Sequence, residues 1–220
     1  MNSFKERLEK IHERIRTAAG DCGRSPESVS LLAVSKLQPI YALQQAMEAG
    51  VALFAENYVQ EAAAKAAALP NATFVLTGPL QRNKARQALK CFKELMSVDR
   101  AALASRLYIL AEELDLTREI WLQIDLWGEH TKMGGCTAEE VQPILDSLGG
   151  TDRLHVKGFM AIPPMGLPSA FSDLAVFRDN WQQRLGRRLL LSMGMSGDLE
   201  EAIKAGSDQV RIGTALFGER

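Results

Sequence analysis

Eight short apolar runs alternate with longer segments of helical character, and this alternation constrains the fold more than any other feature. The runs are typical of buried strands and cover residues 29–35, 51–54, 73–76, 94–98, 119–126, 154–160, 189–193 and 209–213. The intervening segments, such as 40–49, 59–69, 101–114 and 138–148, are rich in helix-forming residues. Strands alternating with helices indicate a parallel sheet, and eight repeats indicate closure. The sequence therefore predicts an α/β fold, a single-domain (β/α)8 TIM-type barrel over residues 1–220.

The last predicted strand is followed by too few residues for a full outer helix, so another element must cover the barrel there. At the start of the chain, Phe4, Leu8, Ile11 and Ile15 form one apolar stripe at helical spacing. We expect this N-terminal helix to cover the gap left by the missing last helix. Its basic residues are interleaved with glutamates and are interpreted as a solvated face, with nucleic-acid binding as the alternative; they are Lys5, Lys10, Arg14 and Arg16.

Charge and cysteine content limit the partners and the compartment. The chain has 26 basic and 27 acidic residues and a net charge of -1, which argues against nucleic acid or an anionic membrane as a partner. Cys22, Cys91 and Cys136 are far apart and form no CxxC pair, as expected of reduced thiols without a metal. No apolar run approaches the roughly 18 residues of a membrane span, and the start lacks a signal-peptide core. We expect a cytoplasmic monomer.

The segment LLAVSKLQPI, Leu31 to Ile40, places a lysine at the end of the first predicted strand. Functional residues of barrels gather at the carboxyl ends of their strands, and Lys36 occupies such a position. Its ammonium could simply reach solvent at the barrel mouth. Alternatively, its free amine could attack a carbonyl of a sugar or of pyridoxal phosphate and form a Schiff base. The segment alone leaves both readings open.

The C-terminal quarter favours a phosphate site opposite this lysine. Barrels that bind phosphate hold it in the loops after strands seven and eight, on backbone amides at a helix N-terminus. The loop after the seventh predicted strand carries Ser196, which is expected to cap the next helix, and Gly213 follows the eighth. Capping and a tight turn are ordinary roles for these residues. Because these residues are expected to lie together opposite Lys36, a phosphate-binding role is favoured over those ordinary roles.

A series of motifs carries a family resemblance through most of the chain: AVSKLQP, FAENYVQE, GPLQRNK, SVDR, EHTKMGG, GFMAIPP, LSMGMSGDLEEAI and VRIGTALFGER. The sequence resembles the pyridoxal phosphate homeostasis proteins, single-domain barrels similar to the N-terminal domain of bacterial alanine racemase. By this resemblance, Lys36 forms the internal aldimine with pyridoxal 5'-phosphate. Ser196, Gly213 and Thr214 match the phosphate-binding positions. Arg211 matches the arginine that faces the pyridine nitrogen, and Asn57 matches an asparagine near the cofactor.

Two positions depart from the pattern of the family. Its second-strand motif usually reads GEN, whereas Ala55 stands here in place of the glycine. Its third-strand motif commonly reads HFIG, and here Val75 stands in place of the histidine. We expect cofactor binding to survive both changes, and no role of that histidine carries over.

The resemblance implies a non-catalytic protein that maintains intracellular vitamin B6 and amino-acid homeostasis by buffering pyridoxal phosphate and delivering it to apoenzymes. Arg211 supports this, because a guanidinium remains protonated and a pyridine nitrogen facing it therefore stays unprotonated. The cofactor ring is then a weak electron sink. A structural ion pair with a residue such as Asp208 is the alternative role for Arg211.

The alternative function is a pyridoxal-phosphate-dependent amino-acid racemase or lyase, which needs a second acid or base on the far face of the cofactor. Alanine racemases supply that group from another domain, for which this chain shows no sequence. Tyr41, Tyr58 and Tyr108 are expected in helices, whereas His130 and Lys132 lie in the loop after the fifth strand. A cofactor-free aldolase would leave the match at Arg211 unexplained.

Overall fold

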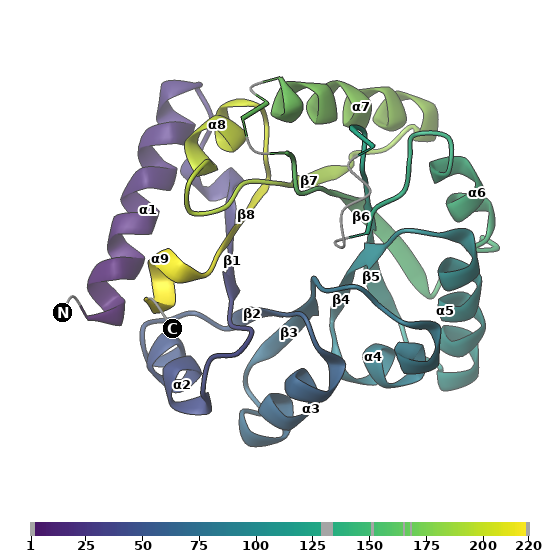
Figure 1. Cartoon of the computed structure of the whole chain (residues 1–220), viewed down its shortest axis with the longest axis horizontal. Helices are drawn as coiled ribbons and strands as arrows, with labels where there is room; N and C mark the ends of the chain where they lie inside the picture. The colour runs from purple at the N-terminus through teal and green to yellow at the C-terminus, as the bar shows by residue number, and fades with distance from the viewer. Residues whose placement is uncertain (1–2, 129–133, 151, 165, 168, 219–220) are drawn as a thin grey trace.

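The computed structural model describes residues 3–128, 134–150, 152–164, 166–167 and 169–218 (Figure 1). Eight parallel strands form one closed barrel in the order of the chain, with the eighth paired to the first. The strands are β1 (Ser30–Val34), β2 (Leu53–Glu56), β3 (Thr73–Leu76), β4 (Glu94–Val98), β5 (Arg118–Gln123), β6 (Leu154–Met160), β7 (Leu190–Ser192) and β8 (Gln209–Ile212). The predicted barrel is therefore confirmed.

The helices surround the barrel on its outside (Figure 1). They are α1 (Phe4–Asp21), α2 (Ile40–Glu48), α3 (Val59–Ala68), α4 (Ala85–Cys91), α5 (Ala101–Leu114), α6 (Val141–Asp146), α7 (Ala170–Leu185), α8 (Leu199–Lys204) and α9 (Thr214–Phe217), with 3-10 turns at Pro26–Ser28 and Arg82–Lys84. In the described part of the chain, no helix has both the length and the apolar character needed to cross a bilayer.

The second strand is displaced by two residues at both ends from its predicted range. It was expected over 51–54 and lies at Leu53–Glu56. The chain first turns at Gly50, which has a φ of 93°, a conformation that glycine adopts without steric cost. The predicted boundary was therefore too early, because Val51 and Ala52 are apolar but belong to the connection.

The core has two parts because each strand is apolar on both faces, as expected of a parallel barrel. Inside the barrel, a cluster of buried side chains contains Leu32, Ala55, Val75, Met96, Trp121 and Met160. The alternate side chains of the strands pack outward against the helices, as Ala33 and Phe54 do. The two residues that depart from the family pattern, Ala55 and Val75, thus belong to the packed barrel interior.

Helix α1 covers the seam between the first and last strands. Its four predicted stripe residues are all buried, and the helix packs against α8 and α9 (Figure 1). The ring of Phe4 lies 5.5 Å from that of Phe217. The expectation of no last helix needs one correction: α9, four residues long, follows β8 and fills part of the gap.

Candidate functional site

A cavity of about 450 Å³ opens at the carboxyl ends of the strands. Six residues singled out from the sequence line it together: Lys36, Asn57, Ser196, Arg211, Gly213 and Thr214. They come from the ends of β1, β2, β7 and β8. Closure of the barrel therefore brings them to one place, although they span most of the chain.

Lys36 is held in a tight turn between β1 and α2. The Gln38 N–H donates to the Ser35 carbonyl at 3.0 Å and closes this turn. Leu37 has a φ of 62°, which is uncommon for a residue with a Cβ atom. Its N–H donates to the Glu61 carboxylate of α3 at 2.6 Å, which stabilises the turn. Lys36 itself is half-buried at the cavity wall.

A buried ammonium supports this turn from below. Lys65 Nζ lies 2.7 Å from the Ser35 carbonyl, and the same distance from one carboxylate oxygen each of Glu56 and Glu61. The Ser35 hydroxyl donates to the same Glu56 oxygen at 2.5 Å. Lys65 therefore links the end of β1 to β2 and α3. This role was not predicted from the sequence, in which Lys65 stands within an alanine-rich helical segment.

Burial also acts on Glu56, whose side chain is fully buried. Desolvation raises the pKa of this carboxyl above its ordinary value, although hydrogen bonds from Lys65 and Ser35 act in the opposite direction. Its second oxygen, Oε2, has no hydrogen-bond partner among the described residues. The ionised carboxylate thus depends strongly on Lys65.

The loop after β7 supplies polar hydrogens to the cavity. The prediction that Ser196 caps the following helix is wrong, because α8 begins at Leu199 and Asp198 occupies the N-cap position. The Asp198 carboxylate instead accepts the Met195 N–H at 2.6 Å and closes the turn. Within the described residues, the N–H groups of Ser196 and Gly197 and the Ser196 hydroxyl have no hydrogen-bond partner. They remain available to an anion.

The loop after β8 adds a second set of donors. Helix α9 begins at Thr214, and the first N–H groups of a helix have no partner within it. Gly213 precedes it and lies against β1, since a Cβ at this position would be 3.5 Å from the Val34 carbonyl oxygen. The two loops together form a wall rich in hydrogen-bond donors, which suits a phosphate or carboxylate.

Two arginines of α1 hold these loops in place. Arg14 donates to both oxygens of Glu200 at 2.6 and 2.7 Å, and to the Ser196 carbonyl at 3.0 Å. Arg7 donates to the Leu216 carbonyl of α9 at 2.7 Å. The interpretation of the basic face as solvated fits Arg16, which pairs with exposed glutamates, but is wrong for Arg14. Helix α1 therefore positions the donor-rich wall.

Arg211 extends from β8 and is 5% exposed. Its guanidinium donates to the carbonyl and hydroxyl of Ser192 at 2.7 and 3.0 Å, and to the Ala161 carbonyl at 2.8 Å. Burial lowers the pKa of Arg211 to about 10, so the group remains charged at neutral pH. The alternative role, an ion pair with a residue such as Asp208, is wrong. The hydrogen-bond acceptors of Arg211 among the described residues are carbonyl and hydroxyl oxygens, and Asp208 contacts three other arginines.

Asn57 follows β2 and is fixed by the neighbouring loop. The Thr77 hydroxyl donates to its side-chain oxygen at 3.1 Å, and Thr77 itself lines the cavity. Gly78 touches the backbone of Asn57 so closely that a Cβ would lie 2.3 Å from its carbonyl oxygen. Thr77 and Gly78 were not predicted as site residues. The glycine at position 78 could have indicated a close contact between the loops after the second and third strands.

The remaining candidates lie elsewhere. Tyr41 and Tyr108 lie on α2 and α5, whereas Tyr58 precedes α3 as its N-cap rather than belonging to the helix. His130 and Lys132 fall outside the described residues. The three cysteines are unpaired. Among the described residues, no cluster of three or more His, Cys, Asp or Glu side chains is arranged to hold a metal ion.

Comparison with known proteins identifies relatives over the full barrel. The family model for the alanine racemase N-terminal domain matches residues 7–220. The "Pyridoxal phosphate homeostasis protein" of Pseudomonas aeruginosa is 39% identical over 230 residues, covering 100% of this chain and 97% of that protein.

Solved structures agree with this. PipY of Synechococcus elongatus, in a structure with PLP bound, has a TM-score of 0.86 and 37% identity, covering 98% of this chain and 100% of that chain. An alanine racemase of Clostridium difficile has a TM-score of 0.80 at 13% identity, covering 100% of this chain and 57% of that one, which shows a shared fold.

Replacing Lys65 with methionine should destabilise the protein in a pH-dependent way. The substitution leaves Glu56 buried without its cation, which typically costs about 3 kcal/mol or more of unfolding free energy. Loss of the cation also raises the Glu56 pKa further. A group whose folded-state pKa is raised favours folding at low pH, and this contribution is lost as pH rises through the folded pKa. The stability gap between wild type and Lys65→Met should therefore widen from about pH 5 to about pH 8.

Urea unfolding at both pH values measures this gap. The control is Lys90→Met, which removes the same charge from an exposed position on α4. A pH-independent loss in Lys65→Met, or an equal loss in Lys90→Met, would contradict the dependence of the buried Glu56 carboxylate on Lys65.

Proposed function

The chain belongs to the family of pyridoxal phosphate homeostasis proteins, whose barrel is the alanine racemase N-terminal domain, and from this premise we propose that it binds pyridoxal 5'-phosphate in the cavity at the carboxyl ends of the strands. The observation that carries the proposal is the convergence of six motif residues on that one cavity. PipY, 37% identical, has a structure with PLP bound.

The chemistry of the cavity suits this cofactor. Its volume of about 450 Å³ falls within the range of small-molecule sites. Lys36 offers an amine that can condense with the aldehyde of the cofactor to form a Schiff base, with release of one water. Ser196, Gly213 and Thr214 offer backbone and hydroxyl donors to its phosphate. Arg211 would offer a hydrogen bond to the pyridine nitrogen, and Asn57 lines the same cavity. The cofactor supplies an electrophilic carbonyl conjugated to a ring.

We further propose that the protein stores and delivers the cofactor instead of catalysing a reaction with it. Arg211 is buried and charged, so it would donate a hydrogen bond to the ring nitrogen of the cofactor and would not protonate it. The described lining residues include one amine, that of Lys36, and contain no carboxylate, imidazole, phenol or thiol. A second acid or base for the far face of a bound amino acid is therefore missing from the described wall. Apo forms of pyridoxal phosphate enzymes would be the recipients.

An amino-acid racemase or lyase remains the second candidate, because the matching family model is named for a racemase domain. The similarity to alanine racemase structures is low in sequence and supports the fold alone. The residue that distinguishes the two functions is a second acid facing the cofactor, which the described lining lacks.

The first test is covalent attachment of the cofactor to Lys36. The loaded wild type should show an imine absorption band, and borohydride should fix the cofactor on Lys36 in a peptide map. Lys36→Ala should lose the adduct but keep the fold, because this side chain lies at the cavity wall and outside the packed clusters. Lys90→Ala serves as the exposed control. An adduct found wholly on Lys132 in the wild type would refute the assignment.

The second test concerns the phosphate. Pyridoxal without phosphate should bind at least about tenfold more weakly than pyridoxal 5'-phosphate, since charge-assisted hydrogen bonds to an anion are strong. Thr214→Val and Ser196→Ala should reduce this preference while leaving pyridoxal binding nearly unchanged. Fluorescence titration of both ligands measures the ratio. Equal affinities in the wild type would show that the phosphate is not recognised by these loops.

The third test separates carrier from enzyme. The loaded protein should interconvert D- and L-alanine far more slowly than a dedicated racemase, because Lys36 is the one proton-transfer group in the described lining. Mixing the loaded protein with an apo form of another pyridoxal phosphate enzyme should restore that enzyme's activity. Chirality followed over time and a reactivation assay measure the two properties. Fast racemisation that disappears in Lys36→Ala would favour the enzyme over the carrier.

A further inference from the structure

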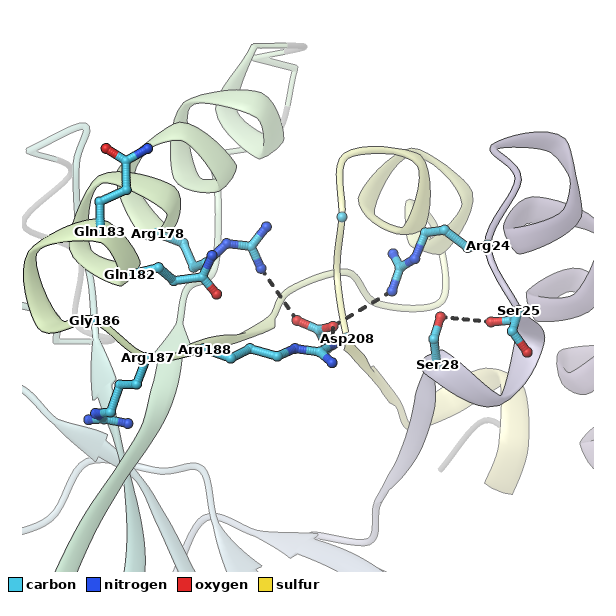
Figure 2. Close-up of a pocket in the computed structure, with 11 residues that line it drawn as sticks. Arg24, Ser25, Ser28, Arg178, Gln182, Gln183, Gly186, Arg187, Arg188 and Asp208 are labelled. Atoms are coloured by element: carbon cyan, nitrogen blue, oxygen red, sulfur yellow. Dashed lines mark hydrogen bonds and ion pairs between the residues drawn. The ribbon is translucent and has the colours of Figure 1, made fainter.

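A second cavity, of about 860 Å³, lies at the opposite end of the barrel, near the amino ends of β1, β7 and β8 (Figure 2). Four arginines line it: Arg24, Arg178, Arg187 and Arg188. They come from the connection after α1, from α7 and from the loop between α7 and β7. Asp208 is the one acidic residue among the described lining residues. The cavity shares no lining residue with the one around Lys36.

Asp208 lies at the centre of this cluster and is 8% exposed. Figure 2 shows Arg24, Arg178 and Arg188 pointing toward it from different sides. The nearest nitrogens lie 3.7, 3.5 and 2.9 Å from its carboxylate oxygens, respectively. The carboxylate also accepts the Leu191 N–H at 2.9 Å. One carboxylate is therefore shared by three guanidinium groups and already has a full set of partners.

The cavity consequently carries surplus positive charge. Arg178 has an additional partner in Asp179, whose carboxylate lies 2.6 Å from its Nε. The four arginines thus have two carboxylate partners among the described residues, Asp208 and Asp179, and Arg187 pairs with neither. Like charges held together in a concave surface repel each other and attract anions.

The arginines divide into a fixed pair and an available pair. Arg24 donates to the Ile203 and Ser207 carbonyls at 2.9 and 2.8 Å, and Arg178 is 14% exposed. Arg187 and Arg188 are exposed. Within the described residues, Arg187 makes one hydrogen bond, to the Val156 carbonyl, and Arg188 makes one, to Asp208. Because a guanidinium carries five N–H donors, most donors of this pair are available to a ligand.

We propose that this cavity binds a small ligand bearing a diphosphate group. Guanidinium forks match phosphate oxygens in bidentate geometry. The surplus charge comes from several segments and is spread across the cavity, which suits two linked phosphates better than a single one. The volume is that of a small-molecule site. Free pyrophosphate and the diphosphate group of a nucleotide share this chemistry.

Isothermal titration calorimetry with pyrophosphate and with ADP tests the proposal, in phosphate-free buffer with and without pyridoxal phosphate. The double variant Arg187→Gln/Arg188→Gln removes the available pair. Arg184→Gln is the matched control, because Arg184 is exposed near the end of α7, stacks on Trp181 and does not line the cavity. Thr214→Val controls for binding at the opposite end.

Saturable binding of at least one probe is expected, weakened about tenfold or more in the double variant. Arg184→Gln and Thr214→Val should stay within about twofold of the wild type. Equal affinity for pyrophosphate and ADP would identify the diphosphate group itself as the ligand, whereas tighter ADP binding would assign the nucleotide. Absence of saturable binding would overturn the proposal, as would unchanged affinity in the double variant or an equal loss in Arg184→Gln. Circular dichroism verifies that each variant is folded.

Discussion

Pairing of the first strand with the last is the constraint on which the candidate site depends. Ser30–Ala33 of β1 lie in register with Gln209–Ile212 of β8, and both strands run in the same direction. The residues that follow the two strands must therefore emerge side by side at one end of the barrel. Lys36 and Thr214 share a cavity wall for this reason, although they lie near opposite ends of the sequence. Helix α1 supports the arrangement by packing across the same seam.

The barrel was predictable because a buried parallel strand has a simple signature, a short apolar run between helical segments. The gathering of the six site residues followed from that prediction, since each stands just beyond or near the end of a strand. Strand ends were less certain, because an apolar residue such as Val51 can also belong to a connection. Whether the six residues bind the cofactor stays a proposal that the experiments above address.

Long polar side chains account for most of what the sequence did not reveal. Helical periodicity assigns a residue to a face, but Lys65 and Arg14 have stems long enough to reach groups on other elements. Their partners, Glu56 and Ser196, are set by the tertiary arrangement. The expected pairing of Arg211 with Asp208 failed for a related reason. Side chains alternate across a strand, so positions three apart point to opposite faces. Arg211 reaches the cavity around Lys36, whereas Asp208 contacts three arginines at the opposite end of the barrel.

The two ends of the barrel hold their guanidinium groups in different ways, with consequences for binding. Arg211 is fixed by carbonyl and hydroxyl acceptors and is withdrawn from water, so its hydrogen bonds are oriented in advance. Arg187 and Arg188 are exposed to solvent, so they lose little when the arginine-lined cavity holds no ligand and must give up water when one binds. The cavity around Lys36 therefore presents donors that are fixed before any ligand arrives. The arginine-lined cavity suits a ligand whose occupancy follows its concentration, because departure of the ligand leaves no buried charge unpaired.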